Sequence, residues 1–303
     1  MPNVKLKNQL HLHFLVFIAG FTGILGELIS IKAVPLVWIR MIIASLILFV
    51  FIKFSKTNIR IHPKKILKLA FAGIIIALHW ITFFGSIDAS NVSIALTMFS
   101  TGAFFASFIE PIVYKRKIIW YEILFGLLVV IGVLIITQSE LKYLYGIVLG
   151  IFSAFFASIF AVLNGKFLEQ HSPTAISFYE FISGVLFITI FMLLGNFNFE
   201  KEVFILTTAD LLYLFILGSV CTAYAFIAAV KVMRHISPYT VVLTYNLEPV
   251  YGIILALLLF PEKEKMSGSF YYGATIIILT VLINGILKNA RKLKRRQSTL
   301  NED

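Results

Sequence analysis

The chain is a succession of long apolar runs separated by short polar or charged segments. The runs are continuous, and most have about 20 residues, the length of helix that crosses the hydrocarbon core of a bilayer. The pattern predicts ten transmembrane helices, at about 14–31, 35–54, 67–87, 92–113, 118–137, 144–164, 175–194, 211–230, 239–260 and 270–287. The predicted fold class is therefore an all-α integral membrane protein.

Composition supports this prediction and removes several classes of function. The 303 residues are 59% hydrophobic and 14% charged, whereas soluble domains are about 25% charged. No polar segment is long enough for a soluble domain. The single cysteine, Cys221, excludes an intramolecular disulfide, and the six histidines lack the spacing of a metal site. We expect no metal and no cofactor.

The distribution of lysine and arginine predicts the orientation, because cytoplasmic loops carry the excess of positive charge. With the amino terminus inside, the inner segments hold most of the 26 basic residues, and both termini are cytoplasmic. The basic tail, 291–303, is then expected to lie near anionic lipid and not to bind nucleic acid. The first run has no clear cleavage site, so we expect a retained helix, which suits a bacterial inner membrane. The outer segments hold only Lys32, Lys142, Lys201, Lys263 and Lys265.

The second half of the chain repeats the first weakly, with a shift of 147 residues in its best part. Ser90 matches Ser237 and Gly126 matches Gly273, while Thr101 falls on Glu248. The predicted units are 1–138 and 139–290, with five helices each. Because five spans are an odd number, the second unit must be inverted relative to the first. Inverted repeats of this kind are typical of transporters with a site near the bilayer midplane.

One stretch of the second half carries a family resemblance. The sequence Tyr245-Asn-Leu-Glu-Pro-Val-Tyr-Gly252, followed by Leu-Phe-Pro-Glu262 and Gly273, is similar to the signature of EamA-type carriers of the drug/metabolite transporter superfamily. The resemblance covers nearly the whole chain. It implies ten helices in two inverted five-helix repeats and the export or exchange of small metabolites, commonly amino acids.

Glu248 and Pro249 are the leading candidates for a solute or coupling site. Glu248 lies about ten residues into its span, where an acidic group costs roughly 2.5–3.5 kcal/mol. Pro249 removes a backbone donor and disfavours helical geometry in the residue before it. A carboxylate at a helix break can bind a solute or a proton. The alternative is that Glu248 only links packed helices through hydrogen bonds.

Arg40 lies well inside a predicted span, about five residues from its outer end, whereas Lys53 and Lys68 lie at span ends. It either snorkels to the interface or points into the bundle toward Glu27, which lies at a similar depth. We favour an Arg40–Glu27 pair facing an outer vestibule. Trp38 is a separate candidate for an aromatic wall. An arginine in such a place can also hold a solute carboxylate.

Four further polar groups lie within the spans. Glu180 is expected to face a cytoplasmic vestibule. His79, which lies mid-span, either relays a proton or is a satisfied packing residue. Tyr224 and Asn246 are candidates to hydrogen-bond a solute.

These features predict a secondary transporter that exports or exchanges a small metabolite, an amino acid or related amphiphile, by alternating access. Proton coupling is a further hypothesis, and the chain has no ATP-binding P-loop motif. The alternative is an exporter of organic cations or drugs, which needs a buried carboxylate but no arginine. An enzyme is not expected, because no histidine cluster or carboxylate pair lies at a membrane face. The expected partners are a small solute and the lipid bilayer, with the protein a monomer or a homodimer.

Overall fold

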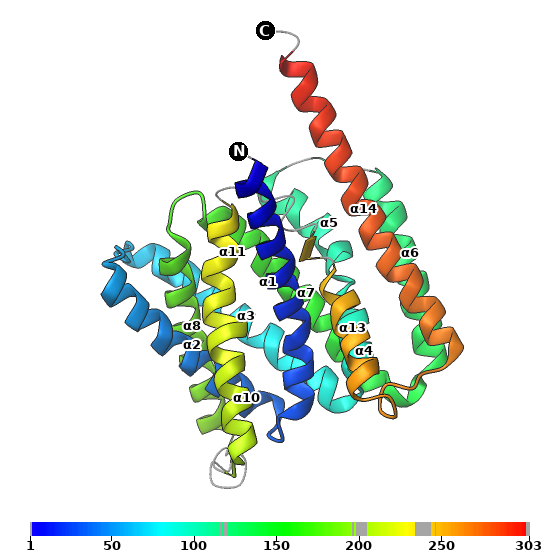
Figure 1. The fold of residues 1–303 in the computed structure, drawn as a ribbon, viewed down its shortest axis with the longest axis horizontal. Coiled ribbons are helices and arrows are strands. Elements are labelled where there is room, and N and C mark those ends of the chain that lie inside the picture. The colour runs from blue at the N-terminus through cyan, green and yellow to red at the C-terminus, as the bar shows by residue number, and fades with distance from the viewer. Residues whose placement is uncertain are drawn as a thin grey trace.

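The structure is a computed structural model that describes residues 2–115, 117, 120–195, 197, 205–233, 244–245 and 247–300. These residues form a helical bundle, and no strand occurs among them (Figure 1). The long helices are α1 (Pro2–Leu28), α2 (Ala33–Ser55), α3 (Pro63–Ala89), α6 (Trp120–Ser139), α7 (Leu144–Phe167), α8 (Pro173–Leu194) and α14 (Gly268–Leu300). The shorter elements are α4 (Val92–Phe99), α5 (Gly102–Tyr114), η1 (Leu141–Tyr143), α10 (Thr208–Gly218), the π-helix η2 (Ser219–Tyr224), α11 (Ala225–Met233) and α13 (Glu248–Leu259).

Within the described residues, 8 segments are long and apolar enough to cross a membrane. Two of them are composite: Val92–Tyr114 contains α4 and α5, and Thr208–Ala229 contains α10, η2 and part of α11. The predicted spans 118–137 and 239–260 coincide with the shorter apolar helices Ile123–Ser139 and Glu248–Leu259. The prediction of an all-α membrane protein is confirmed.

The amino-terminal end of α1 and the carboxy-terminal end of α14 lie at the same end of the bundle (Figure 1). We call the opposite end the distal face. Carboxylates tie loops from the two halves of the chain together there. Asp210 accepts hydrogen bonds from the backbone nitrogen of Ser30 at 2.7 Å and from its hydroxyl at 2.8 Å. Glu140 accepts one from the backbone nitrogen of Ser267 at 2.9 Å.

Two predicted spans are interrupted by a turn among their described residues. Helix α4 ends at Phe99 and α5 begins at Gly102, after a turn that contains the buried Thr101. Helix α13 begins at Glu248, with Pro249 in its first turn, where the missing N–H group is least costly. Thr101 and Glu248 are the residues that the predicted repeat register superimposes. The two interruptions therefore fall at matching positions in the two halves.

The helix contacts also recur between the two halves. Helix α1, the first of the first half, packs against α13 of the second half. In the same way α7, the first helix of the second half, packs against α4 and α5, the span that the repeat register matches to α13. Helix α3 packs against α7, as α11 packs against α1. Helices α6 and α14 pack against each other through Gly132 and Gly273, where a Cβ on either would lie 2.9–3.0 Å from the other's carbonyl oxygen. Both glycines are therefore needed for this close approach.

Gly73→Ala is expected to destabilise the fold. An added Cβ would overlap the carbonyl oxygen of Glu180, which is backbone and cannot rotate away, so α3 and α8 would have to separate. Overpacking of this kind costs about 1–3 kcal/mol. The thermal unfolding midpoint of the purified protein in detergent measures the effect. Gly268→Ala is the matched control, because a Cβ there meets nothing within 4 Å. Equal unfolding midpoints for the two variants would contradict the expectation.

Candidate functional site

Arg40 is buried in the middle of the bundle. It lies on α2, its residue is 2% exposed, and its Nε donates a hydrogen bond of 2.7 Å to Oγ1 of Thr222. Its Cζ lies 4.1 Å from the ring centroid of Trp80 and 5.6 Å from that of Phe84. Its Nη1 is buried without a hydrogen-bond partner. Snorkelling to the interface is therefore wrong for Arg40, which presents a free donor inside the protein.

The residue that orients Arg40 belongs to the π-helix η2. Thr222 donates its hydroxyl to the carbonyl oxygen of Leu217 at 2.7 Å, five residues earlier, and accepts from Arg40. A Cβ on Gly218, just before η2, would lie 3.1 Å from the carbonyl oxygen of Arg40, so α2 and α10 approach closely here. Single π-helical turns are frequent at functional sites. Thr222 was not predicted as a site residue, because nothing in the apolar pattern distinguishes a π-helical turn from an α-helix.

Glu248 occupies the first turn of α13, where the partial positive charge of a helix start favours a carboxylate. Its side chain is half-buried and interacts electrostatically with Arg40, but no direct ion pair joins these two described residues. Helix α13 is held against α1 at Gly20, where a Cβ would lie 2.9 Å from the backbone nitrogen of Gly252. The predicted candidate Asn246 lies outside the described residues.

His79 lies on α3, beside the same group of side chains. Its Nδ1 is 2.9 Å from Oγ of Ser153 and 3.1 Å from the carbonyl oxygen of that residue. Its ring lies 5.4 Å from that of Phe99, the last residue of α4, and it interacts electrostatically with Arg40. We call Arg40, His79, Trp80, Thr222 and Glu248 the central cluster. It joins residues of α2, α3, η2 and α13.

Glu180 does not face a vestibule, contrary to the expectation, because its side chain is enclosed by helices. It is fully buried on α8, and one oxygen accepts a hydrogen bond of 3.4 Å from Nδ2 of Asn164. The other oxygen, Oε1, has no partner. The close approach of Gly73 on α3 leaves no room between these helices. Glu180 is thus an enclosed carboxyl group between α3, α7 and α8.

Three other predicted site residues have different partners from those expected. Glu27 forms an ion pair with Lys263, so the predicted Arg40–Glu27 pair is wrong. Trp38 donates its indole N–H to Oγ1 of Thr189 at 2.8 Å and packs α2 against α8, leaving Trp80 as the aromatic face at Arg40. Tyr224 is 42% exposed on the outside of the bundle, and its hydroxyl lies 2.8 Å from Nε2 of His11.

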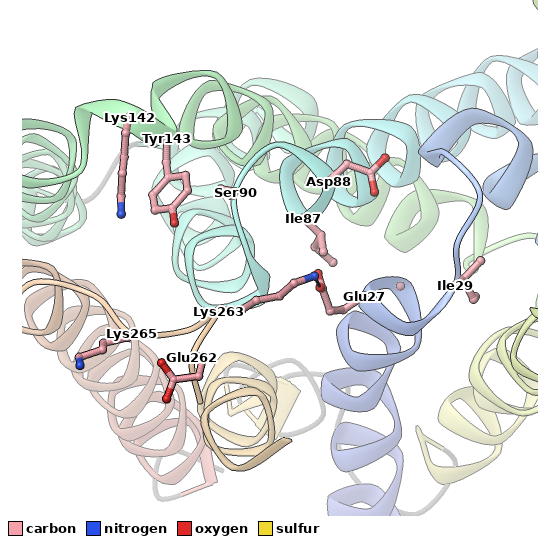
Figure 2. Close-up of a pocket in the computed structure, with 11 residues that line it drawn as sticks. Glu27, Ile29, Ile87, Asp88, Ser90, Lys142, Tyr143, Glu262, Lys263 and Lys265 are labelled. Atoms are coloured by element: carbon pink, nitrogen blue, oxygen red, sulfur yellow. Dashed lines mark hydrogen bonds and ion pairs between the residues drawn. The ribbon is translucent and has the colours of Figure 1, made fainter. Parts of the chain in front are cut away.

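A polar cavity of about 340 Å³ opens at the distal face (Figure 2). It contains the carboxylates of Glu27, Asp88 and Glu262 and the ammonium groups of Lys142, Lys263 and Lys265. The hydrogen bond and charge of Glu27 raise the pKa of Lys263, which lies in the loop after α13, above its usual value. The ammonium group of Lys263 therefore remains charged at neutral pH.

Comparison with known proteins identifies the family. The model of the EamA-like transporter family matches residues 10–138 and again residues 144–286. A protein described as an uncharacterized transporter of Archaeoglobus fulgidus is 27% identical over 160 residues, an alignment that covers 50% of this chain and 52% of that protein. A solved crystal structure has the same fold, with a TM-score of 0.64 at 11% identity over 93% of this chain and 98% of the other. The chain therefore belongs to the EamA-like transporter family and is a membrane transporter.

Proposed function

We propose that the protein is a secondary transporter that exports or exchanges a small metabolite, an amino acid or a related amphiphile, by alternating access. The observation that carries this proposal is the buried, unpartnered Nη1 of Arg40, which lies in the same central cluster as the carboxylate of Glu248. A charge inside the membrane is costly unless a partner compensates it. A zwitterionic solute would supply a carboxylate for the unpartnered donor of Arg40 and an ammonium group for the carboxylate of Glu248.

The neighbours of Arg40 favour a solute with an apolar part. The Trp80 ring stacks under the guanidinium and lies 5.8 Å from the ring of Phe181 and 6.3 Å from that of Phe226. Thr222 fixes Nε, and the unpartnered Nη1 of the planar guanidinium is free for a carboxylate oxygen. The carboxylate and ammonium of the solute would then be held by charge, and its side chain by the aromatic rings.

The interruptions at Thr101 and Glu248 support alternating access. Discontinuous helices that meet near the midplane are typical of transporters built from inverted repeats. We assign the two repeats to residues 1–138 and 139–290, with a basic tail at 291–303. Opening and closing would then occur by movement of one repeat relative to the other around the central cluster, with the protein acting as a monomer or a homodimer.

The proposed coupling ion is a proton. Glu248 and His79 are ionisable groups of the central cluster, and a proton bound at either one would compensate a change in the charge of the cluster. We place both termini in the cytoplasm of a bacterial cell, with the protein in the inner membrane, because the basic residues gather in the segments on the side of the termini. The distal face is then the outer face.

A second candidate function is the export of organic cations or drugs. The carboxylate of Glu248 and the ring of Trp80 favour it, since aromatic faces attract cations. In this case Arg40 would stack on Trp80 without touching the solute.

Counterflow in proteoliposomes tests the proposed function. Vesicles are loaded with one unlabelled solute and given a trace of the same solute labelled, across a panel of amino acids and organic cations. We expect the label of at least one amino acid to accumulate transiently in vesicles with protein and not in empty vesicles. Accumulation of organic cations alone would favour the second candidate, and no accumulation of any solute would contradict both.

A further inference from the structure

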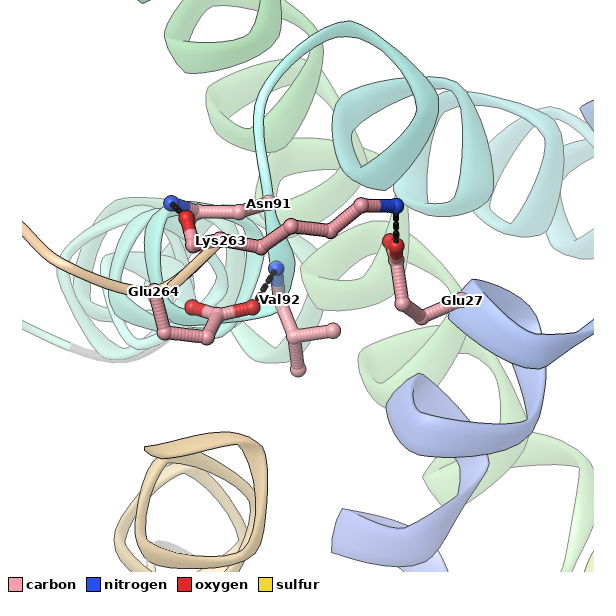
Figure 3. Close-up of polar contacts among 5 residues, drawn as sticks. All are labelled: Glu27, Asn91, Val92, Lys263 and Glu264. Atoms are coloured by element: carbon pink, nitrogen blue, oxygen red, sulfur yellow. Dashed lines mark hydrogen bonds and ion pairs between the residues drawn. The ribbon is translucent and has the colours of Figure 1, made fainter. Parts of the chain in front are cut away.

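A buried carboxylate joins the two halves of the chain at the distal face. Glu264, in the loop after α13, is fully buried, and its Oε1 and Oε2 accept hydrogen bonds from the backbone nitrogens of Val92 and Ser93 at 3.0 and 2.9 Å (Figure 3). These nitrogens belong to the first turn of α4, whose partial positive charge favours a carboxylate. The loop of one half thus caps a helix of the other.

Asn91, the residue before α4, adds hydrogen bonds between α4 and the loop after α13. Its Oδ1 accepts a hydrogen bond of 2.9 Å from the backbone nitrogen of Ile94 and so caps α4. Its Nδ2 donates to the carbonyl oxygen of Lys263 at 3.1 Å and to Sδ of Met266 at 3.2 Å. Asn91 is 1% exposed, so these contacts are sheltered from water.

The ion pair between Lys263 and Glu27 extends the connection to α1 (Figure 3). Glu27 is next to the last residue of that helix, and its side chain is 10% exposed, while that of Lys263 is 70% exposed. The pair lies at the wall of the polar distal cavity (Figure 2). The end of α1, the start of α4 and the loop after α13 are therefore joined to one another beside this cavity.

The three helices that are joined in this way also pack closely against one another between the distal face and the central cluster. The backbone of α13 approaches α1 at Gly20 and Gly252, and a Cβ on Gly252 would overlap the side chain of Leu96 on α4. Glu248 of the central cluster begins α13, and Glu264 follows its end. One helix of 12 residues, about 18 Å long, therefore links the central cluster to the distal connection.

We propose that Glu264, Asn91 and the Lys263–Glu27 pair form a gate that closes the distal end of the transport path. To open this end, α13 must move away from α1 and α4, which breaks the contacts of Glu264 and the ion pair together. The exposed Glu262 lies in the same loop but makes none of these contacts, so it is not part of the gate. This gate depends on the proposed transport function, because only a transporter needs a distal opening.

The native cysteine provides the test. Cys221 is the single cysteine of the sequence, is 6% exposed, and lies beside Thr22 and Arg40. A membrane-impermeant maleimide is added to intact spheroplasts or to inside-out vesicles, with a tag at the carboxyl terminus to identify the side of the termini. In Glu264→Gln, we expect Cys221 to be labelled about tenfold faster from the distal side only, because the open state becomes more populated. Glu262→Gln is the matched control and is expected to label like the wild type.

Two outcomes would overturn the gate. One is a folded Glu264→Gln that labels at the wild-type rate, and the other is an equal acceleration from both sides, which a merely structural cap would produce. If Glu264→Gln does not fold, charge reversal replaces it. Lys263→Glu is then expected to accelerate distal labelling and the added change Glu27→Lys to restore slow labelling, and an unchanged rate in Lys263→Glu would overturn the gate. The labelling requires no solute, so a negative solute panel and a negative labelling result are distinguishable.

Discussion

Arg40→Ala is expected to abolish transport of a carboxylate-bearing solute while leaving the protein folded. The substitution removes the free donor at the central cluster, and each hydrogen bond to a charged group contributes about 1.5–3 kcal/mol. Loss of one such contact lowers affinity about tenfold to a hundredfold, and loss of a bidentate pair lowers it further. The initial rate of amino acid uptake into proteoliposomes, at equal amounts of folded protein, measures this loss.

Two controls separate a role in binding from a general effect. Lys53→Ala removes a positive charge from the same helix at an exposed position and is expected to transport like the wild type. Arg40→Lys keeps the charge but not the planar arrangement of donors, so we expect only partial recovery. Wild-type rates in Arg40→Ala would show that Arg40 does not bind the solute, and retained uptake of an organic cation would support the second candidate function.

Glu248→Gln is expected to lower the uptake rate about tenfold or more, or to remove its dependence on pH. Glutamine has nearly the same shape as glutamate but can neither carry the charge that would hold an ammonium group nor exchange a proton. The position of Glu248 at the start of α13 and its interaction with Arg40 make the charge the feature that is lost. Uptake rates at two pH values, in wild type and variant, measure the effect.

The control for Glu248→Gln is Glu262→Gln, the same change at an exposed position of the following loop. A Glu248→Gln protein with the rate and pH profile of the wild type would mean that Glu248 only supports the packing of α13. The search for the coupling group would then move to His79.

The apolar helices were predictable from the sequence, and the direction in which each side chain points from its helix was not. The apolar runs gave the spans, and Glu248-Pro249 gave the break at the start of α13. Both lipid and protein interior favour apolar side chains, so membrane helices lack the polar face that shows which side of a soluble helix is exposed. For this reason Trp38 and Tyr224 lie in helical segments as predicted but point away from the central cluster, while Trp80 faces it.

The missed contacts depend on loops and on irregular helix turns. Glu27 and Arg40 were expected at similar depths, but the loop after α13 brings Lys263 to Glu27, and that placement depends on long-range packing. Glu264 is an acidic residue in a charged loop, with no sequence feature that distinguishes its burial from the exposure of Glu262. The break between α4 and α5 contains no proline, and the apolar pattern predicted one continuous span there.

The most direct test of the solute site is counterflow of one exchanging solute in the wild type, Arg40→Ala and Glu248→Gln, side by side. Counterflow requires no driving gradient, so it reports solute binding and exchange without the coupling ion. The proposed site predicts exchange in the wild type and loss of exchange in Arg40→Ala, with exchange in Glu248→Gln lost if the carboxylate holds the solute and retained if it carries only the proton. Undiminished exchange in Arg40→Ala, with the same solute selectivity as the wild type, would contradict a solute site at the central cluster.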